Sequence, residues 1–196
     1  GNMSVVRYRM SPDEILGCAH KAVDFGYGTL VMQSGEDPGI TPEWLADVIR
    51  RIKTETGLAV TLSVGEQPDE ALRLWREAGA DRYLLRFETS NPQLYKRIHP
   101  SRPGGREERI SMLRALRDIG YETGSGALIG FPGQTWADLA RDIALFSELH
   151  LHMIGVGPFI LHPGTPLARE AHKLLAPEGE QVPNTHQMAF KVIALA

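Results

Sequence analysis

Hydrophobic residues along this chain recur alternately with the period of a helix and the period of a strand. The helical period predicts amphipathic helices at residues 11–25, 41–56, 69–78, 107–119 and 136–149. Short apolar runs predict strands at 29–33, 59–63, 80–89, 121–129 and 153–159, and a last helix is predicted at 185–196. Because each strand follows a helix, the pattern indicates βαβ units, a parallel sheet and an α/β fold.

Two α/β architectures fit this order of elements, a doubly wound sheet and a (β/α)8 barrel. The chain contains no G-x-G-x-x-G after its first strand and no G-x-x-x-x-G-K-[ST], which weakens the doubly wound interpretation. Polar residues follow the carboxyl ends of successive strands, namely Glu36, Glu66, Glu88 with Thr89, Gln134 and His162. That placement favours a barrel whose site is assembled from several βα loops.

The predicted strand at 80–89 carries an unusual polar face. Side chains alternate along a strand, so one face is apolar and consists of Tyr83, Leu85 and Phe87. The other face presents Arg82, Leu84, Arg86 and Glu88. Charges inside a parallel sheet are costly unless they pair with each other or bind a polar ligand. The strand alone leaves three interpretations open: an internal salt-bridge ladder, an edge strand with one wet face, or a ligand site.

Composition restricts the classes of function further. The chain has 196 residues, 42% of them hydrophobic, and a net charge of -3, so neither nucleic acid nor an anionic membrane is expected as a partner. No apolar run is long enough to span a membrane, so a single cytoplasmic domain over residues 1–196 is expected. Cys18 is the single cysteine, and we interpret it as a small buried hydrophobic residue.

Four motifs, in this order along the chain, resemble those of a known family. They are residues 33–38, residues 82–92, residues 121–135 with their glycines, and residues 155–160. Together they resemble the radical S-adenosylmethionine (SAM) superfamily, and most closely its [FeFe]-hydrogenase maturase (HydE) type with the biotin synthase and methylornithine synthase (PylB) relatives. The resemblance implies a partial (β/α)8 TIM barrel in which strands two to six are present and strands one, seven and eight lie outside the chain.

The resemblance also implies roles for residues near the strand ends. Ser34, Gly35 and Glu36 match the turn that receives the methionine ammonium of SAM, although an ordinary βα turn is the alternative. Arg86 and Glu88 match positions that contact SAM, where a carboxylate can accept hydrogen bonds from both ribose hydroxyls.

Further positions follow from the same comparison of motifs. Thr89 is an additional SAM-binding candidate beside Glu88, and Arg82 matches a position that could bind a substrate carboxylate, with an interior ion pair as the alternative. Arg109 matches an arginine that binds the SAM carboxylate, while Ile129 and Phe159 match positions beside the adenine. Without the resemblance, Arg109 would be interpreted as a solvated helix residue and Ile129 as core.

The cluster ligands of the superfamily are not in this sequence. A C-x3-C-x2-C loop normally holds a [4Fe–4S] cluster, and one cysteine cannot do so, so no residue of this chain is predicted to be catalytic or to bind metal and the chain alone is predicted to be inactive. The intact parent is expected to generate a 5′-deoxyadenosyl radical from SAM, to act on a small substrate in hydrogenase maturation, and to meet other maturation proteins. The alternatives are a biotin-synthase-like or methylornithine-synthase-like enzyme, or a non-catalytic binding module without a cluster.

Overall fold

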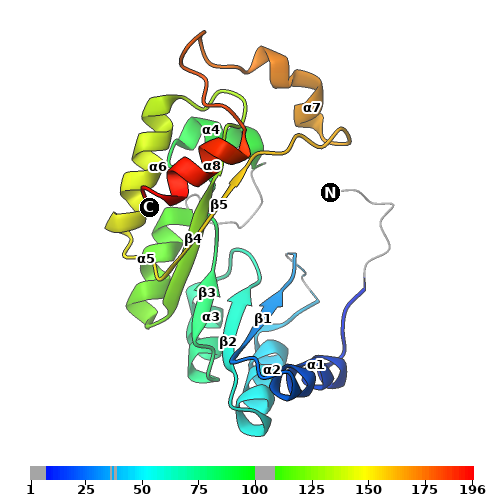
Figure 1. Cartoon of the computed structure of the whole chain (residues 1–196). Helices are drawn as coiled ribbons and strands as arrows, with labels where there is room; N and C mark the ends of the chain where they lie inside the picture. The colour runs from blue at the N-terminus through cyan, green and yellow to red at the C-terminus, as the bar shows by residue number, and fades with distance from the viewer. Residues whose placement is uncertain (1–7, 36, 38, 100–108) are drawn as a thin grey trace. The chain divides into compact units, whose positions relative to one another are not determined.

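The computed structural model describes residues 8–35, 37, 39–99 and 109–196, and it divides into two compact units (Figure 1). The first unit is Gly1–Arg82 and the second is Tyr83–Ala196. The strands pair in chain order, β1-β2-β3-β4-β5, as expected for an α/β sheet built from successive βαβ units. The expectation of a single domain over residues 1–196 stays a prediction.

The first unit contains two parallel strands with their helices. Its elements are α1 (Pro12–Asp24), β1 (Thr29–Gln33), α2 (Pro42–Glu55), β2 (Ala59–Ser63) and α3 (Asp69–Glu77). Thr29 pairs with Ala59 in the parallel β1–β2 ladder, and α2 contacts both α1 and α3. These elements confirm the sequence prediction. The starts of α1 and α2 carry local signals, namely the capping box of Ser11 and Glu14 and the side-chain cap of Thr41.

The core of the first unit lies along one face of α2. Leu45, Ile49 and Ile52 recur at helical spacing and are buried with Leu62 of β2. Exposed residues of the same unit include Cys18, which the sequence analysis expected to be buried. The reason is its place on α1, where the buried residues are Leu16 and Ala19 and the cysteine lies on the outer side.

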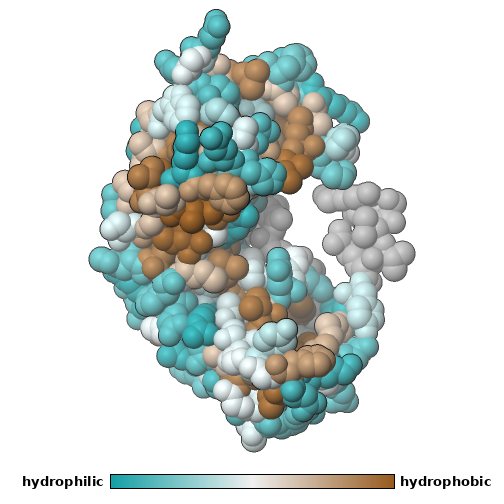
Figure 2. Space-filling view, in the orientation of Figure 1, coloured by the Kyte–Doolittle hydropathy of each residue, from teal (hydrophilic) through white to brown (hydrophobic). Residues whose placement is uncertain are grey.

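The second unit begins within β3 and contains the longer strands. Its elements are β3 (Arg82–Leu84), α4 (Pro92–Ile98), α5 (Arg109–Ile119), β4 (Glu122–Ile129), α6 (Trp136–Glu148), β5 (Met153–Pro158), α7 (Pro166–Glu170), a 3-10 turn (Ala171–Lys173) and α8 (His186–Ile193). Both α5 and α6 contact β4 and lie on the same side of it in Figure 1, whereas α8 contacts β5. Figure 2 shows apolar surface beside α8, whose exposed residues include Phe190 and Ile193.

Strand β3 is shorter than the predicted 80–89 strand. Backbone pairing with β4 is interrupted because the Ser125 hydroxyl accepts a hydrogen bond from the Phe87 amide over 3.2 Å and donates to the Leu85 carbonyl over 2.8 Å. A side chain thereby replaces two ladder contacts, and the segment re-enters the ladder only at Glu88. The predicted burial is confirmed nevertheless, since Tyr83, Leu85 and Phe87 are all buried.

Three short elements were not predicted, namely α4, α7 and the 3-10 turn. In α4 the signal was present in the sequence, because Asn91 caps the helix through its side chain and Pro92 occupies the first position. The predicted helix at 107–119 begins at Arg109 in the described part, since residues 100–108 lie outside it. The last predicted helix is confirmed as α8, which Thr185 caps.

Glycines allow the closest backbone contacts of the second unit. A Cβ atom on Gly126 of β4 would lie 1.8 Å from the carbonyl oxygen of Gly155 on β5, which no real side chain could tolerate. Gly130, with φ of +76°, likewise leaves room for the backbone of Pro183 and Asn184. These glycines bring the end of β4 close to its neighbours and so determine the path of the loop that follows.

Candidate functional site

Glu88 has the least ordinary backbone conformation near the carboxyl end of the strands in the second unit. Its φ is 66°, the left-handed region that costs a non-glycine residue about 1–2 kcal/mol. Strand β4 holds it there from both sides, because the Glu88 amide donates to the Gly126 carbonyl and the Leu128 amide donates to the Glu88 carbonyl. Strain of this kind persists where surrounding contacts fix it, and it is frequent at ligand sites.

The charged groups of Arg86 and Glu88 lie together at this point. Arg86 Nε is 3.5 Å from Glu88 Oε2, and the Glu88 side chain is 14% exposed. Within the described part of the chain, neither of these two buried atoms has a hydrogen-bond partner. A buried carboxylate oxygen and a buried guanidinium nitrogen without partners are rare, and such groups are expected where a ligand or bound water completes the site.

Arg109 joins this pair from the start of α5. Its Nη1 donates to the Arg86 carbonyl over 2.7 Å, and its guanidinium lies 5.7 Å from the centre of the Tyr95 ring. The other end of Arg86 donates from Nη2 to the Ala127 carbonyl over 2.9 Å, so both arginines are held by backbone oxygens. Burial raises the pKa of Glu88, and the positive charges of Arg86 and Arg109 offset part of that rise.

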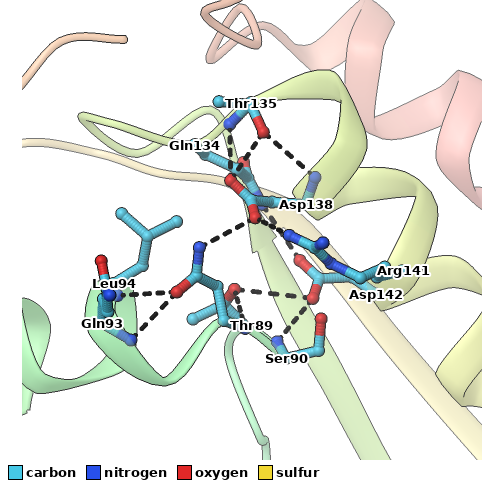
Figure 3. Close-up of polar contacts among 10 residues, drawn as sticks. Thr89, Ser90, Gln93, Leu94, Gln134, Thr135, Asp138, Arg141 and Asp142 are labelled. Carbon is cyan, nitrogen blue, oxygen red and sulfur yellow. Dashed lines mark hydrogen bonds and ion pairs between the residues drawn. The ribbon is translucent and has the colours of Figure 1, made fainter.

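A buried polar network includes Thr89 and Ser90, the two residues that follow Glu88 in the chain (Figure 3). Asp142 of α6 accepts hydrogen bonds from the Ser90 amide over 2.5 Å and from the Gln134 side-chain amide over 3.2 Å. One turn earlier on α6, Asp138 accepts from the Asn91 side-chain amide over 2.9 Å and forms an ion pair with Arg141. The network therefore connects the turn after Glu88 with α6.

Gln134 extends the network to the loop after β4. Its Oε1 accepts from the Gly130 amide over 2.6 Å, while its Nε2 donates to the Leu128 carbonyl over 3.1 Å. Gln134 was expected among the polar residues at strand ends, whereas Asp138 and Asp142 were not predicted as site residues. The only sequence signal was their spacing of four within an otherwise apolar helix face.

The pKa values of the two acids in this network, Asp142 and Asp138, are shifted in opposite directions. Burial raises the pKa of Asp142 to about 6, an effect that the hydrogen bonds from Ser90 and Gln134 only partly offset and that nearby Asp138 increases. Burial acts on Asp138 in the same sense, but hydrogen bonds from Thr135 and Asn91 and the contact with Arg141 together lower its pKa. Both side chains carry charge near neutral pH.

The remaining predicted residues of the second unit have partners inside the protein. Thr89 is buried, and its hydroxyl accepts from the Asn91 amide over 3.1 Å and lies 3.5 Å from Asp142 Oδ1. Ile129 is fully buried, and the backbone amide of Phe159 donates to its carbonyl over 2.8 Å. Of the residues predicted here, the structure therefore brings Arg86, Glu88 and Arg109 together as one charged group.

The predicted residues of the first unit lie beyond β1 and at the start of β3. The Ser34 amide donates to the Ser63 carbonyl over 3.2 Å, Gly35 is exposed, and Glu36 lies outside the described residues. Arg82 donates from Nη1 to the Thr29 hydroxyl over 3.2 Å. The roles of these four residues stay predictions.

The strand-end site and the sheet define the class of the protein. Residues 2–146 match the Radical SAM superfamily, and the chain belongs to it. A solved structure of methylornithine synthase (PylB) superimposes with a TM-score of 0.79 at 25% identity, covering 98% of this chain and 54% of that chain. The partial (β/α)8 barrel of the radical SAM type is thereby confirmed.

Sequence relatives narrow the class. The chain is 50% identical over 169 residues to the [FeFe] hydrogenase maturase subunit HydE of Thermotoga maritima, covering 86% of this chain and 48% of that protein. It is 30% identical over 136 residues to a biotin synthase of Persephonella marina, covering 69% of this chain and 39% of that enzyme. The chain thus spans about half the length or less of these curated relatives, and it resembles the HydE type most strongly of the two.

Two observations bear on what the site could hold. Glu88 Oε2 and Arg86 Nε lack hydrogen-bond partners among the described residues. They fit a ligand that offers hydroxyl groups to the carboxylate and a polar acceptor to the guanidinium, as SAM does. Among the described residues, no three His, Cys, Asp or Glu side chains gather as metal ligands would, and no helix there is long and apolar enough to cross a membrane. The residues present therefore fit SAM, whereas they do not fit an iron–sulfur cluster.

Proposed function

We propose that this chain binds SAM at Glu88, Arg86 and Arg109, with the Glu88 carboxylate on the ribose. The observation that carries the proposal is Glu88 itself, a carboxylate in a left-handed conformation, mostly buried, with an oxygen that lacks a hydrogen-bond partner among the described residues. A carboxylate accepts hydrogen bonds from vicinal hydroxyls, and a ribose supplies two. Burial raises the pKa of Glu88, and the positive charges of Arg86 and Arg109 oppose part of that rise.

Other predicted contacts complete the proposed binding mode. Ile129 and Phe159 would flank the adenine, and Ser34, Gly35 and Glu36 would receive the methionine ammonium; support for these roles comes from the family resemblance. Arg109 would bind the SAM carboxylate, Thr89 would support the ribose contact, and Arg82 would face a small substrate with a carboxylate. The chain's own residues would bind and orient SAM, since binding and orientation are what a protein contributes to cofactor chemistry.

For the intact protein we propose a cytoplasmic radical SAM enzyme of hydrogenase maturation. Support comes from the 50% identity to HydE, and a small-molecule substrate and other maturation proteins would be its partners. The [4Fe–4S] cluster, with ligands outside this chain, would supply the electron that cleaves SAM. A biotin-synthase-like or methylornithine-synthase-like reaction is the alternative within the superfamily.

The proposal is tested by SAM binding and cleavage in the full-length protein, reconstituted anaerobically. Arg86→Ala and Glu88→Ala are expected to weaken SAM binding by about tenfold or more, because each removes a charged hydrogen-bonding group. Arg114→Ala and Glu148→Ala are matched controls, since both residues are exposed on α5 and α6, and they should leave the affinity unchanged. Unchanged SAM affinity in both site variants would refute the site.

One observation favours a second candidate, a binding module that has lost its cluster. The sequence contains a single cysteine, Cys18, and that residue is exposed on α1. The full-length gene separates the two candidates. Three cysteines spaced C-x3-C-x2-C outside this chain support the enzyme, and their absence supports the binding module.

A further inference from the structure

Two acidic side chains of α6 are buried where apolar residues would be expected. Asp138 and Asp142 are 3% and 0% exposed and lie one helical turn apart, so they occupy the same face of the helix. Both accept hydrogen bonds from the turn after Glu88, Asp142 from the Ser90 amide and Asp138 from the Asn91 side chain. The helix therefore holds the chain immediately after the residue proposed to bind the ligand (Figure 3).

Asp142 is surrounded by hydrogen-bond donors. Its Oδ1 accepts from the Ser90 amide and lies 3.5 Å from the Thr89 hydroxyl, and its Oδ2 accepts from the Gln134 side-chain amide. Gln134 cannot reverse its amide without loss, since its Oε1 already accepts from Gly130. An ionised carboxylate offers acceptors alone, which is what these three donors require. Asparagine, a neutral side chain of the same shape, would turn its NH2 group against the Ser90 amide or the Gln134 side-chain amide, both of which are donors.

The position of Asp142 also excludes direct contact with a ligand. Its side chain is fully buried, and its closest partner on the turn is two residues away from Glu88. Glu88 is fixed to β4 through its own amide and carbonyl, and the next residues are fixed to α6 through Thr89 and Ser90. Two independent anchors on either side of a strained residue determine where its side chain points.

We propose that Asp142 is a positioning residue, which holds the turn at Thr89 and Ser90 so that the Glu88 carboxylate faces the ribose hydroxyls of SAM. This inference rests on the proposed function of Glu88. It explains why a buried charge is present on α6, where an apolar side chain would pack at lower desolvation cost. Asp142 acts through the turn, so its loss should alter recognition of the hydroxyls more than general affinity.

The test measures that recognition as a ratio of affinities. The full-length protein is titrated with SAM and with its 2′,3′-dideoxyribose analogue, and the ratio of the two dissociation constants is compared among variants. Wild-type protein is expected to prefer SAM by about tenfold or more, because hydrogen bonds to a charged group are lost in the analogue. Glu88→Ala should abolish the preference. Asp142→Ala should reduce it by about threefold or more, as expected when the carboxylate acceptor that holds the turn is lost.

A matched control distinguishes positioning from general destabilisation. Leu145→Ala removes a buried side chain from the same helix without touching the polar network, so it should lower stability and keep the wild-type ratio. Asp142→Asn keeps the shape of the side chain but turns an NH2 donor against the Ser90 amide or the Gln134 amide, so it gives the same readout if Asp142→Ala does not fold.

The outcomes distinguish a failure of the inference about Asp142 from a failure of the proposed function of Glu88. A reduced ratio in the Asp142 variants, with the ratio kept in Leu145→Ala, supports the inference. Equal weakening for both ligands in the Asp142 variants would show that Asp142 is merely structural and would overturn it. If Glu88→Ala leaves the wild-type ratio unchanged, the proposed function of Glu88 fails, and the inference fails with it for a distinguishable reason.

Discussion

At the scale of single residues, positive φ values outside glycine distinguish two positions. Among the described residues these are Glu88, with φ of 66°, and His150, with φ of 50°. His150 is exposed directly after α6, where a left-handed residue ends many helices and glycine is preferred. Glu88 is mostly buried at the proposed SAM site. The same backbone strain thus occurs at a helix end at one position and at a proposed ligand contact at the other.

From the positive φ values of Glu88 and His150 we predict a trade-off between protein stability and SAM binding. His150→Gly and Glu88→Gly should each raise the free energy of unfolding by roughly 0.5–1 kcal/mol, the strain relieved less the entropy cost of glycine. His150→Gly should leave SAM affinity unchanged, whereas Glu88→Gly should lose most of it. Urea denaturation and SAM titration of the two variants check this. A loss of stability in Glu88→Gly would show that its conformation is not strained.

At the scale of elements, α6 carries two acids whose pKa values move in opposite directions. The pKa of Asp142 is raised to about 6 from its usual 3.8, and that of Asp138 is lowered. A carboxyl group with a raised pKa favours the folded state below its unfolded pKa and loses that contribution as the pH rises through the folded value. A lowered pKa does the reverse, and its contribution is lost as the pH falls.

The two acids should therefore give opposite pH dependences. Relative to Asp142→Asn, the wild-type protein should lose up to about 3 kcal/mol of unfolding free energy between about pH 4 and pH 7. Relative to Asp138→Asn, it should gain stability as the pH rises through the acid range. Urea denaturation across this range measures both differences, and slopes of the same sign for the two variants would contradict the assignment.

At the scale of the whole molecule, the chain has the fold of half a radical SAM barrel but one cysteine. The PylB structure is covered to 54% of its length and the T. maritima HydE to 48%. A [4Fe–4S] cluster that chelates SAM needs three thiolates and leaves one iron open. The binding residues and the cluster ligands would then belong to different segments of the intact protein.

If the cluster ligands lie outside this chain, the outcome of iron–sulfur reconstitution can be predicted. The 196-residue chain, treated anaerobically with iron and sulfide, should not assemble one [4Fe–4S] cluster per chain, because Cys18 is its single cysteine. Iron and sulfide content together with the visible absorption spectrum measure the result, and a radical SAM enzyme that carries a C-x3-C-x2-C motif serves as the positive control. A stoichiometric cluster on the chain itself would show that other residues can replace the thiolates.

Local sequence signals determined most of the secondary structure and part of the site. Caps such as Ser11 and Thr185 and the helical and strand periods depend on neighbours a few residues apart, so they can be read without the fold. The alternation along residues 80–89 likewise placed Tyr83, Leu85 and Phe87 in the core. It also placed Arg86 and Glu88 on one face, where the structure shows their charged groups together.

Tertiary structure alone decided how Glu88 is held. Ser125 interrupts the predicted strand from 38 residues away through the Phe87 amide, and Asp142 holds Ser90 from 52 residues away. Neither contact has a local signal, because a hydrogen bond between distant segments exists only after βαβ packing brings them together. The sequence by itself therefore determined which residues carry charge near the strand ends. The fold determined that Glu88 is strained, mostly buried and left with a carboxylate oxygen that has no hydrogen-bond partner among the described residues, an arrangement that a ligand would complete.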